Sequence, residues 1–302
     1  MISRIDVRTE GFLNSLDQIH RRLEGAQAKI TSGRRINSAS DSPDQVSRLL
    51  AVRSQLSAVQ QDRVNLGRVQ SEVAAAEQSL QHGLQLVDRI LVLGAQGASD
   101  VTPPEARQTL AAEVGALLSQ LVGISTAAVD GRYIFAGDAD GSIPYTVNLN
   151  ADPPYSVYQG SAATREILHP TGVRMRVART AEQIFEDPSP SRNVFGAVNA
   201  IRDALASGTT EAIGDALNRV RTAAVHLNNE LAFYGAAQNE IGQSLQYAYQ
   251  EELRLKSELS RIEDADLTEA ILELNQAQLH QQAALGTQAR TQSKPSLFDF
   301  LR

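Results

Sequence analysis

The chain has 302 residues, a formal net charge of −7, 42% apolar residues and 5% aromatic residues. This apolar content is enough for a packed core and argues against a disordered acidic tail, while the shortage of aromatic residues favours helices packed on helices over a large sheet. The negative charge argues against a nucleic-acid-binding protein, because phosphate contacts need a basic face. The absence of cysteine excludes disulfides, thiolate metal sites and cysteine nucleophiles.

The sequence has no segment typical of a cleavable secretory signal or of a membrane span. The first residues lack an apolar core, and no stretch approaches the length of uninterrupted apolar sequence that a spanning helix needs. We therefore expect no membrane partner, and we expect any export to use a route that does not read a cleavable signal.

The first predicted helix carries a heptad pattern of apolar residues. The pattern steps alternately by four and by three residues, which places its members on one helix face. These members are Phe12, Leu16, Ile19, Leu23, Ala26 and Ile30. Gly33 is predicted to end the helix, because glycine readily adopts the left-handed conformation found just beyond helix C-termini.

The second predicted helix begins at Ser42-Pro43-Asp44-Gln45, where Ser is expected at the N-cap and Pro at the first helical position. The row beside its main apolar row is interrupted by Arg63, Gln70 and Glu77. A helix from about Asp44 to Leu93 would be about 75 Å long at about 1.5 Å per residue, which indicates a rod. The main row repeats every seven residues and consists of Val52, Val59, Leu66, Val73, Leu80 and Val87.

A third helix is predicted to begin at Thr102-Pro103-Pro104-Glu105, with Thr102 as its cap, and to end near Asp130-Gly131. Glycine, proline and aspartate then punctuate the chain, so we expect a small β-rich insertion over residues 138–190. Its predicted strands lie in Tyr145–Val147, Tyr155–Tyr158 and Val173–Val177, and Asp187–Pro190 is predicted to form the closing turn.

Helical patterns resume at Val194, break at Ser207-Gly208 and continue through another heptad row. The members of that row are Ile241, Ala248, Leu255 and Ile262, with Leu245 and Leu259 beside them. The spacing then slips, and Asp266 is expected to cap a new helix with a register of its own. The members of the new register are Leu267, Ile271, Leu274, Gln278 and Leu285.

Long amphipathic helices at both ends predict a mainly α fold, an antiparallel helical bundle or coiled-coil rod with a small β-rich domain inserted in the middle. The terminal helices are each too thin to bury an apolar stripe, and Phe300 adds another apolar group. We therefore expect intermolecular assembly seams, formed by Phe12, Leu16, Ile19, Leu23, Ile30, Leu267, Ile271, Leu274, Leu285 and Phe300. The predicted parts are an N-terminal assembly helix (1–41), rod helices (42–137), the β-rich insertion (138–190), further rod helices (191–264) and a C-terminal assembly helix (265–302).

No arrangement of catalytic or metal-binding residues is apparent in the sequence. Asp264 and Asp266 would point to different sides of a helix, so helix capping explains them better than acid–base catalysis. The segment Gly131–Gly137 lacks the strand–turn–helix context and the lysine of a nucleotide-binding loop. No histidine has a partner at metal-ligand spacing, and we interpret all five as solvated helix-face residues: His20, His82, His169, His226 and His280. We expect no metal, no cofactor and no enzymatic activity.

Two motifs at opposite ends of the chain resemble those of the bacterial flagellin superfamily. The stretch Leu23–Asp41 is similar to the N-terminal flagellin signature, a helix followed by Ser-Gly-x-Arg-Ile-Asn-Ser-Ala, with Ser42 in place of the second aspartate of that signature. The stretch Ser260–Leu267 resembles the C-terminal flagellin motif. The residues that carry the resemblance are Gly33, Arg35, Asn37, Asp41, Asp264 and Asp266.

Within this superfamily, the heptapeptide Gly131–Gly137 resembles the hook–filament junction type of hook-associated protein more than the filament flagellins. Its matching residues are Gly131, Tyr133, Phe135 and Gly137. The resemblance implies self-assembly into a helical ring between a neighbouring hook-associated protein and flagellin. It also implies export through the flagellar channel to an extracellular position in the flagellum, an export chaperone bound to the C-terminal helix, and terminal segments that become ordered on assembly.

Two other interpretations stay open. A flagellin-type filament subunit is the alternative, and a cytoplasmic signalling coiled coil is a remote one that explains the heptads but not the β-rich insertion. A hydrolase within the insertion is disfavoured, because the insertion is short and His169 has no metal-ligand partner in it.

Overall fold

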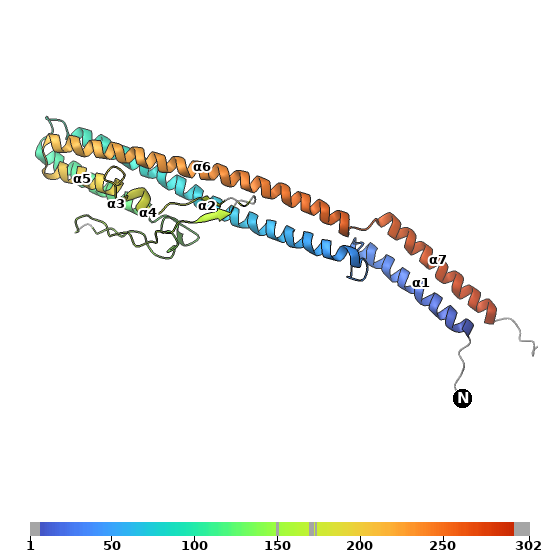
Figure 1. The fold of residues 1–302 in the computed structure, drawn as a ribbon. Coiled ribbons are helices and arrows are strands. Elements are labelled where there is room, and N and C mark those ends of the chain that lie inside the picture. Colours follow the sequence, from blue (N-terminus) through green and yellow to red (C-terminus); the bar gives the residue numbers. More distant parts are fainter. Residues whose placement is uncertain (1–6, 149–150, 169–171, 173, 293–302) are drawn as a thin grey trace, which may run out of the picture. The chain divides into compact units, whose positions relative to one another are not determined.

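The computed structural model describes residues 7–148, 151–168, 172 and 174–292. Within these residues the fold is mainly α, as predicted, with two small antiparallel sheets (Figure 1). None of the described helices combines the length and the apolar character needed to cross a membrane. The helices are α1 (Val7–Ser32), α2 (Pro43–Gly97), α3 (Pro104–Ile124), α4 (Ala181–Phe185), α5 (Val194–Ser207), α6 (Thr210–Glu263) and α7 (Leu267–Gln292). The strands are β1 (Ala128–Val129), β2 (Arg132–Tyr133), β3 (Glu166–Leu168) and β4 (Arg174–Arg176).

The chain divides by its internal contacts into two units, which we describe separately. Unit 1 combines Met1–Val59 with Glu251–Arg302, and unit 2 is Gln60–Gln250, so α2 and α6 each contribute to both. The predicted boundaries at 41/42 and 264/265 lie close to helix ends. The unit boundaries lie inside α2 and α6, because the connector between α1 and α2 packs on the nearest parts of those two helices.

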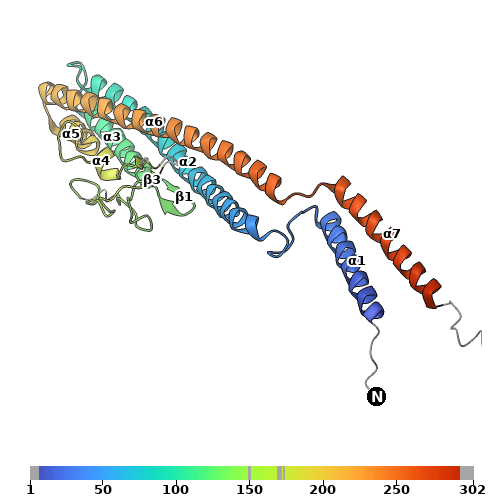
Figure 2. The same cartoon turned by 45° about the vertical axis from the view of Figure 1, so that its right-hand side comes forward.

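In unit 1, α1 and α7 lie side by side and run in opposite directions (Figures 1 and 2). Two contacts fix this direction: Lys29 Nζ lies 2.8 Å from Glu273 Oε2, and His20 Nε2 lies 3.4 Å from Gln281 Nε2. The connector after α1 shares a small apolar core with the start of α2 and the end of α6. That core consists of Ile36, Leu49, Val52, Leu255 and Ile262.

The predicted ends of the two terminal helices are confirmed. α1 ends at Ser32, and Gly33 follows with φ of 68° and donates its N–H to the Lys29 carbonyl at 2.9 Å. α7 begins directly after Asp266, whose Oδ1 accepts hydrogen bonds from the N–H groups of Thr268 at 2.8 Å and Glu269 at 3.2 Å. Both arrangements satisfy backbone groups that helix ends leave unpaired.

Unit 2 is a helical bundle of α3, α5 and the adjoining parts of α2 and α6. α2 and α6 are antiparallel here, since a Cβ atom at Gly83 would lie 3.6 Å from Leu227 and one at Gly94 would lie 2.7 Å from Leu217. Gly94 therefore permits an approach that a side chain would obstruct. The predicted heptad row of α2 is confirmed as core, because its members Leu66, Val73, Leu80 and Val87 are at most 4% exposed.

The β-rich region of unit 2 is held on α5 by a cluster of aromatic rings. β1 and β2 form a hairpin whose turn residues, Asp130 and Gly131, have φ values of 51° and 78°. Asp-Gly is a typical sequence for a two-residue hairpin turn that needs two positive φ angles. β3 pairs with β4 in an antiparallel register. The aromatic cluster consists of Tyr145, Tyr155, Tyr158, Phe185 and Phe195.

The third helix begins at Pro104, inside the predicted stretch Thr102–Glu105, but its predicted end and its predicted cap are wrong. α3 ends at Ile124, and Asp130-Gly131 belongs to the hairpin turn. Thr102 does not cap α3, because Pro103 occupies the N-cap and the Thr102 hydroxyl donates instead to the Gln96 carbonyl at 2.8 Å.

The predicted β-type runs have mixed outcomes. Tyr145–Val147 and Tyr155–Tyr158 form no named strand and share a single bridge, Val147 to Tyr155, whereas the third run contains β4. β3 has only three residues, too few for its alternation to be recognised in the sequence. The closing turn around Asp187–Pro190 is confirmed, since the Asp187 side chain accepts the Ser189 N–H at 2.9 Å and a bridge from Glu186 to Asn193 flanks the turn.

Candidate assembly interface

The predicted N-terminal seam lies on the side of α1 that faces α7. Ala26 is only 1% exposed, while the other seam residues are half-buried. A single partner helix covers part of an apolar stripe, so some of this stripe still contacts solvent. The half-buried members are Phe12, Leu16, Ile19, Leu23 and Ile30.

The predicted C-terminal seam divides between two sides of α7. Leu274 is half-buried on the side facing α1, but Leu267, Ile271 and Leu285 are 49%, 48% and 51% exposed. Leu272 and Leu279, which the sequence analysis did not single out, are exposed as well. Phe300 lies outside the described residues.

The side of α7 that faces α1 is lined mainly by small and polar residues. Its members follow alternating steps of four and three: Ala270, Leu274, Ala277, Gln281, Ala284 and Gln288. Only one of them is a large apolar residue. The other large apolar side chains of α7 therefore remain available to a partner molecule. Full burial of one such side chain contributes about 1.5–3 kcal/mol.

The motif residues from the two ends of the chain come together where the two connectors cross. Arg34 and Asp264 form an antiparallel bridge, with Arg35 N–H donating to the Glu263 carbonyl at 2.6 Å and Ala265 N–H donating to the Gly33 carbonyl at 3.0 Å. Two segments that are distant in sequence are thus joined through their backbones.

A cluster of charged side chains closes over these connectors, and we call Arg34, Arg35, Arg53 and Glu263 the clasp. The Glu263 side chain is only 6% exposed, and its Oε1 lies 2.6 Å from Arg34 Nε and 2.8 Å from Arg53 Nη2. Arg35 donates to the Ile262 carbonyl at 2.7 Å and to Gln45 Oε1 at 2.6 Å. Three cations at the C-terminal end of α6 also complement its helix dipole.

The sequence analysis identified Arg35 but not Arg53 or Glu263 as site residues. Both look like ordinary surface charges in the sequence, because nothing local marks them as partners. Arg53 and Glu263 are far apart in the sequence, so their contact could be recognised only from the fold, which brings α2 and α6 together.

The loop after the clasp is organised by Asp41. One of its carboxylate oxygens accepts the N–H groups of Ser38 at 2.7 Å and Asn37 at 2.8 Å, and the other accepts the Ser38 hydroxyl at 3.0 Å. The Asn37 amide in turn donates to the Arg34 carbonyl at 3.0 Å. The Ser38 and Asn37 N–H groups lower the pKa of Asp41, because they stabilise its ionised form.

The second motif, Gly131–Gly137, is part of the core of unit 2. Phe135 is fully buried and meets Phe185 and Tyr234 edge-to-face, with ring centroids 6.1 Å and 6.3 Å away. Its carbonyl accepts the Ala181 N–H at 2.8 Å. The Tyr133 N–H donates to the Asp140 carbonyl at 2.8 Å.

The backbone at position 137 can accommodate only glycine. Its φ is 65°, and a Cβ atom there would stand 2.6 Å from the Ala163 carbonyl oxygen and closer still to that of Ser161. Glycine is therefore the residue that this close backbone contact permits.

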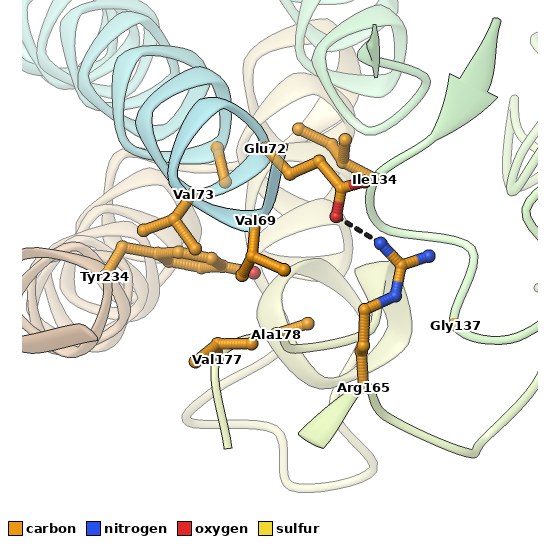
Figure 3. A pocket seen from close by; sticks show the side chains of 10 residues that line it. Val69, Glu72, Val73, Ile134, Gly137, Arg165, Val177, Ala178 and Tyr234 are labelled. Carbon is orange, nitrogen blue, oxygen red and sulfur yellow. Dashed lines mark hydrogen bonds and ion pairs between the residues drawn. The ribbon is translucent and has the colours of Figure 1, made fainter. Parts of the chain in front are cut away.

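A small cavity lies beside this motif, between α2, α6 and the β-rich region (Figure 3). An ion pair between Arg165 and Glu72 covers one side of it, and Tyr234, Val69 and Val73 line the other. Its volume of about 20 Å³ is enough for a single water molecule and far too small for a substrate. The cavity therefore belongs to the packing of unit 2.

The described residues contain no group of three or more His, Cys, Asp or Glu side chains that could hold a metal ion. His20, His82 and His280 are exposed, as predicted, whereas His169 lies outside the described residues. The prediction is wrong for His226, which is buried and has its Nε2 3.1 Å from the Gln183 carbonyl.

Asp264 and Asp266 lie in the connector between α6 and α7, and not within a helix as the sequence analysis had assumed. Asp266 caps α7, as expected, but Asp264 has a different role. It closes the end of α6, where its N–H donates to the Ser260 carbonyl at 2.9 Å and its carboxylate accepts the Ser260 hydroxyl.

The sequence matches two family models, one towards each end of the chain. Residues 9–140 match the bacterial flagellin N-terminal helical region, and residues 213–301 match the bacterial flagellin C-terminal helical region. The chain belongs to the bacterial flagellin family. All the terminal motif residues, the clasp and the Gly131–Gly137 segment lie inside these two matched ranges.

Individual relatives agree with this family. Flagellin FlaB1 of Treponema pallidum is 25% identical over 286 residues, which cover 91% of this chain and 90% of that protein. A flagellar hook-associated protein of Legionella pneumophila, HAP-3, has a similar fold, with a TM-score of 0.61, 14% identity, and coverage of 70% of this chain and 98% of that one. Bacillus cereus FlgL matches with a TM-score of 0.57 and 20% identity, over 69% of this chain and 98% of that one.

Proposed function

We propose that this flagellin-family protein is a structural subunit of the hook–filament junction, which works by self-assembly and not by catalysis. The observation that carries the choice of the junction is the Gly131–Gly137 segment. It resembles the junction type in sequence, and Phe135 and Gly137 each have a specific place in the packing of unit 2. The fold similarity to hook-associated proteins from other bacteria is consistent with this choice.

Self-assembly is supported by the apolar side chains that α7 leaves in solvent. Leu267, Ile271 and Leu285 are about half exposed in the isolated chain. A neighbouring copy that covered them would remove apolar surface from water, which is the main driving force for association. Head-to-tail contacts of this kind build helical arrays.

A filament subunit is the second candidate, and one observation favours it. The Treponema relative is named a flagellin, and its similarity extends over nearly the whole of both chains. The family assignment also leaves no basis for a cytoplasmic signalling coiled coil.

The partners in this proposal are further copies of the chain, a neighbouring hook-associated protein and flagellin. The protein leaves the cell through the flagellar export channel without a cleavable signal and resides in the extracellular part of the flagellum. Before export, a chaperone covers the apolar side of α7.

Deletion of the gene tests the junction against the filament role. A junction protein is required to attach the filament, so the deletion strain should have intact hooks, no filaments, and flagellin shed into the medium. Hooks that still bear filaments would contradict the junction role and favour a minor flagellin. Complementation with the unmodified gene should restore the filaments.

Charged substitutions in α7 test self-assembly through the exposed apolar residues. Ile271→Glu combined with Leu285→Glu should leave the purified chain folded and exported but should abolish motility in the complemented deletion strain. Thr287 lies on the opposite side of α7, so Thr287→Glu is the matched control. The strain with this variant should retain motility. Full motility of the double variant would contradict assembly through this side of α7.

A further inference from the structure

An open groove lies between the connector that follows α1 and the first turns of α2. Its volume is about 300 Å³, which is at the lower end of the range of pockets that hold small molecules, about 300–1,000 Å³. Ile36 and Leu49 line it and are buried, whereas Leu50, which also lines it, is 58% exposed. The groove therefore has room for one or two large apolar side chains, and covering Leu50 would remove apolar surface from water.

Two cations of the clasp line the same groove. The side chains of Arg34 and Arg53 are 56% and 42% exposed, and both contact one carboxylate, that of the buried Glu263. Two positive charges thus share one negative charge. None of the described residues that line the groove is acidic. An occupant that combines large apolar side chains with a carboxylate would match both properties of the groove.

One segment outside the described residues has this composition. Residues 297–301 read Leu-Phe-Asp-Phe-Leu, so four large apolar residues flank Asp299. The exposed apolar side of α7 matches the groove less well, because it has no carboxylate. Glu269 and Glu273, the acidic residues of that helix, lie about 120° or more around the helix axis from Leu267.

The position of this segment shows which copy it would reach. α7 has 26 residues, so it is about 39 Å long at about 1.5 Å per residue. The groove lies beside the start of α7, because the Arg34–Asp264 bridge ties the connector to the residues just before that helix. Phe300 follows the other end, eight residues beyond Gln292, and extended chain spans at most about 3.6 Å per residue, or about 29 Å here. With α7 helical, the segment therefore falls short of its own groove.

We propose that residues 297–301 of one copy dock into the groove of a neighbouring copy, with apolar side chains on Leu50 and with Asp299 beside Arg34 and Arg53. The contact is head-to-tail, so its repetition connects copies in a row. It rests on the proposed self-assembly and adds to it a donor segment and a receiving groove. The terminal helices are expected to become ordered on assembly, so the contact belongs to the assembled flagellum and not to the dilute monomer.

Disulfide trapping in assembled flagella tests the contact, and the absence of cysteine from the chain gives a clean background. The deletion strain is complemented with the full chain carrying Leu50→Cys and either Phe300→Cys or Leu301→Cys, because neighbouring residues of an extended segment point to opposite sides. Flagella from motile cells are oxidised mildly, and the chain is detected with an antibody on a non-reducing gel. Contact between copies should give a ladder of dimers, trimers and longer products. A variant that does not support motility alone is co-expressed with the unmodified chain, and cross-linked dimers are then scored instead.

Gln55→Cys with Phe300→Cys is the matched control, because Gln55 is exposed on the next turn of α2 but does not line the groove. Its cross-linked fraction should be lower by at least about fivefold, since two cysteines whose Cβ atoms point apart do not form a disulfide. Adding Asp299→Asn to the Leu50 pair should lower the cross-linked fraction by about two- to fivefold, the effect of losing a partly exposed ion pair. Lys294→Gln, in the same segment, should leave it unchanged.

Cross-links within single copies, or none between copies at either position, would overturn the proposal. A ladder of equal strength from the Gln55 control would do the same. So would a stronger ladder from Leu50→Cys with Ile271→Cys, which would assign the groove to the exposed side of α7. The ladder is expected whether the copies lie in the junction or in the filament, so failure of this contact is distinguishable from failure of the junction role.

Discussion

Replacing Phe135 by alanine should destabilise unit 2 strongly and leave unit 1 unchanged. The ring is fully buried and makes edge-to-face contacts with Phe185 and Tyr234. Truncation of a buried phenylalanine typically costs about 3–5 kcal/mol, which includes the cavity left behind. For a unit of this size, each kcal/mol lowers the unfolding temperature by about 2–4 °C, so we expect a decrease of about 6–20 °C.

The tyrosines provide a selective readout for this experiment. All seven tyrosines lie within Gln60–Gln250 and the chain has no tryptophan, so the near-ultraviolet tyrosine signal reports unit 2. Val101→Ala is the control, since Val101 is 90% exposed and its truncation should change stability by no more than about 0.5 kcal/mol. A loss below about 1 kcal/mol for Phe135→Ala would refute the argument that this motif residue anchors the core.

Three further outcomes are expected. Because the pKa of Asp41 is lowered, its ionised carboxylate stabilises the loop fully at pH values above the ordinary aspartate pKa of about 3.9. This contribution is lost as the pH falls through the lower pKa of the folded state. An NMR titration of the Ser38 N–H with a midpoint at or above about pH 3.9 would disprove it. Gly137→Ala should lower the free energy of unfolding by about 1–3 kcal/mol, because Gly137 has a positive φ and two carbonyl oxygens beside it. Gly242→Ala, in open space within α6, should instead raise the free energy of unfolding by about 0.5–1 kcal/mol. In dilute monomer, the amides of α1 and α7 should exchange far faster than those of unit 2, because Ala26, Ala270 and Ala277 are the only residues of this pair that are buried among those the structure describes. Hydrogen-exchange protection equal to that of α3 would contradict ordering on assembly.

The helices and several of their ends were predictable from local sequence signals. Gly33 and Asp266 act within a few residues of themselves, so their roles at the ends of α1 and α7 could be read directly. The heptad row of α2 likewise reveals a buried face, because its seven-residue spacing is a property of one helix. Thr102 was misjudged because a neighbouring carbonyl, that of Gln96, competed for its hydroxyl.

The sequence by itself therefore determined the flagellin-like ends of the chain, the helical character of its long segments and the apolar stripes they carry. The tertiary structure decided which side of α7 faces α1 and which side remains in solvent. It also decided that Glu263 is buried between Arg34 and Arg53, and that His226 is a core residue. The physical reason is that periodicity and capping depend on neighbours along the chain, whereas the partner of a charge or of a helix face depends on segments more than 200 residues away.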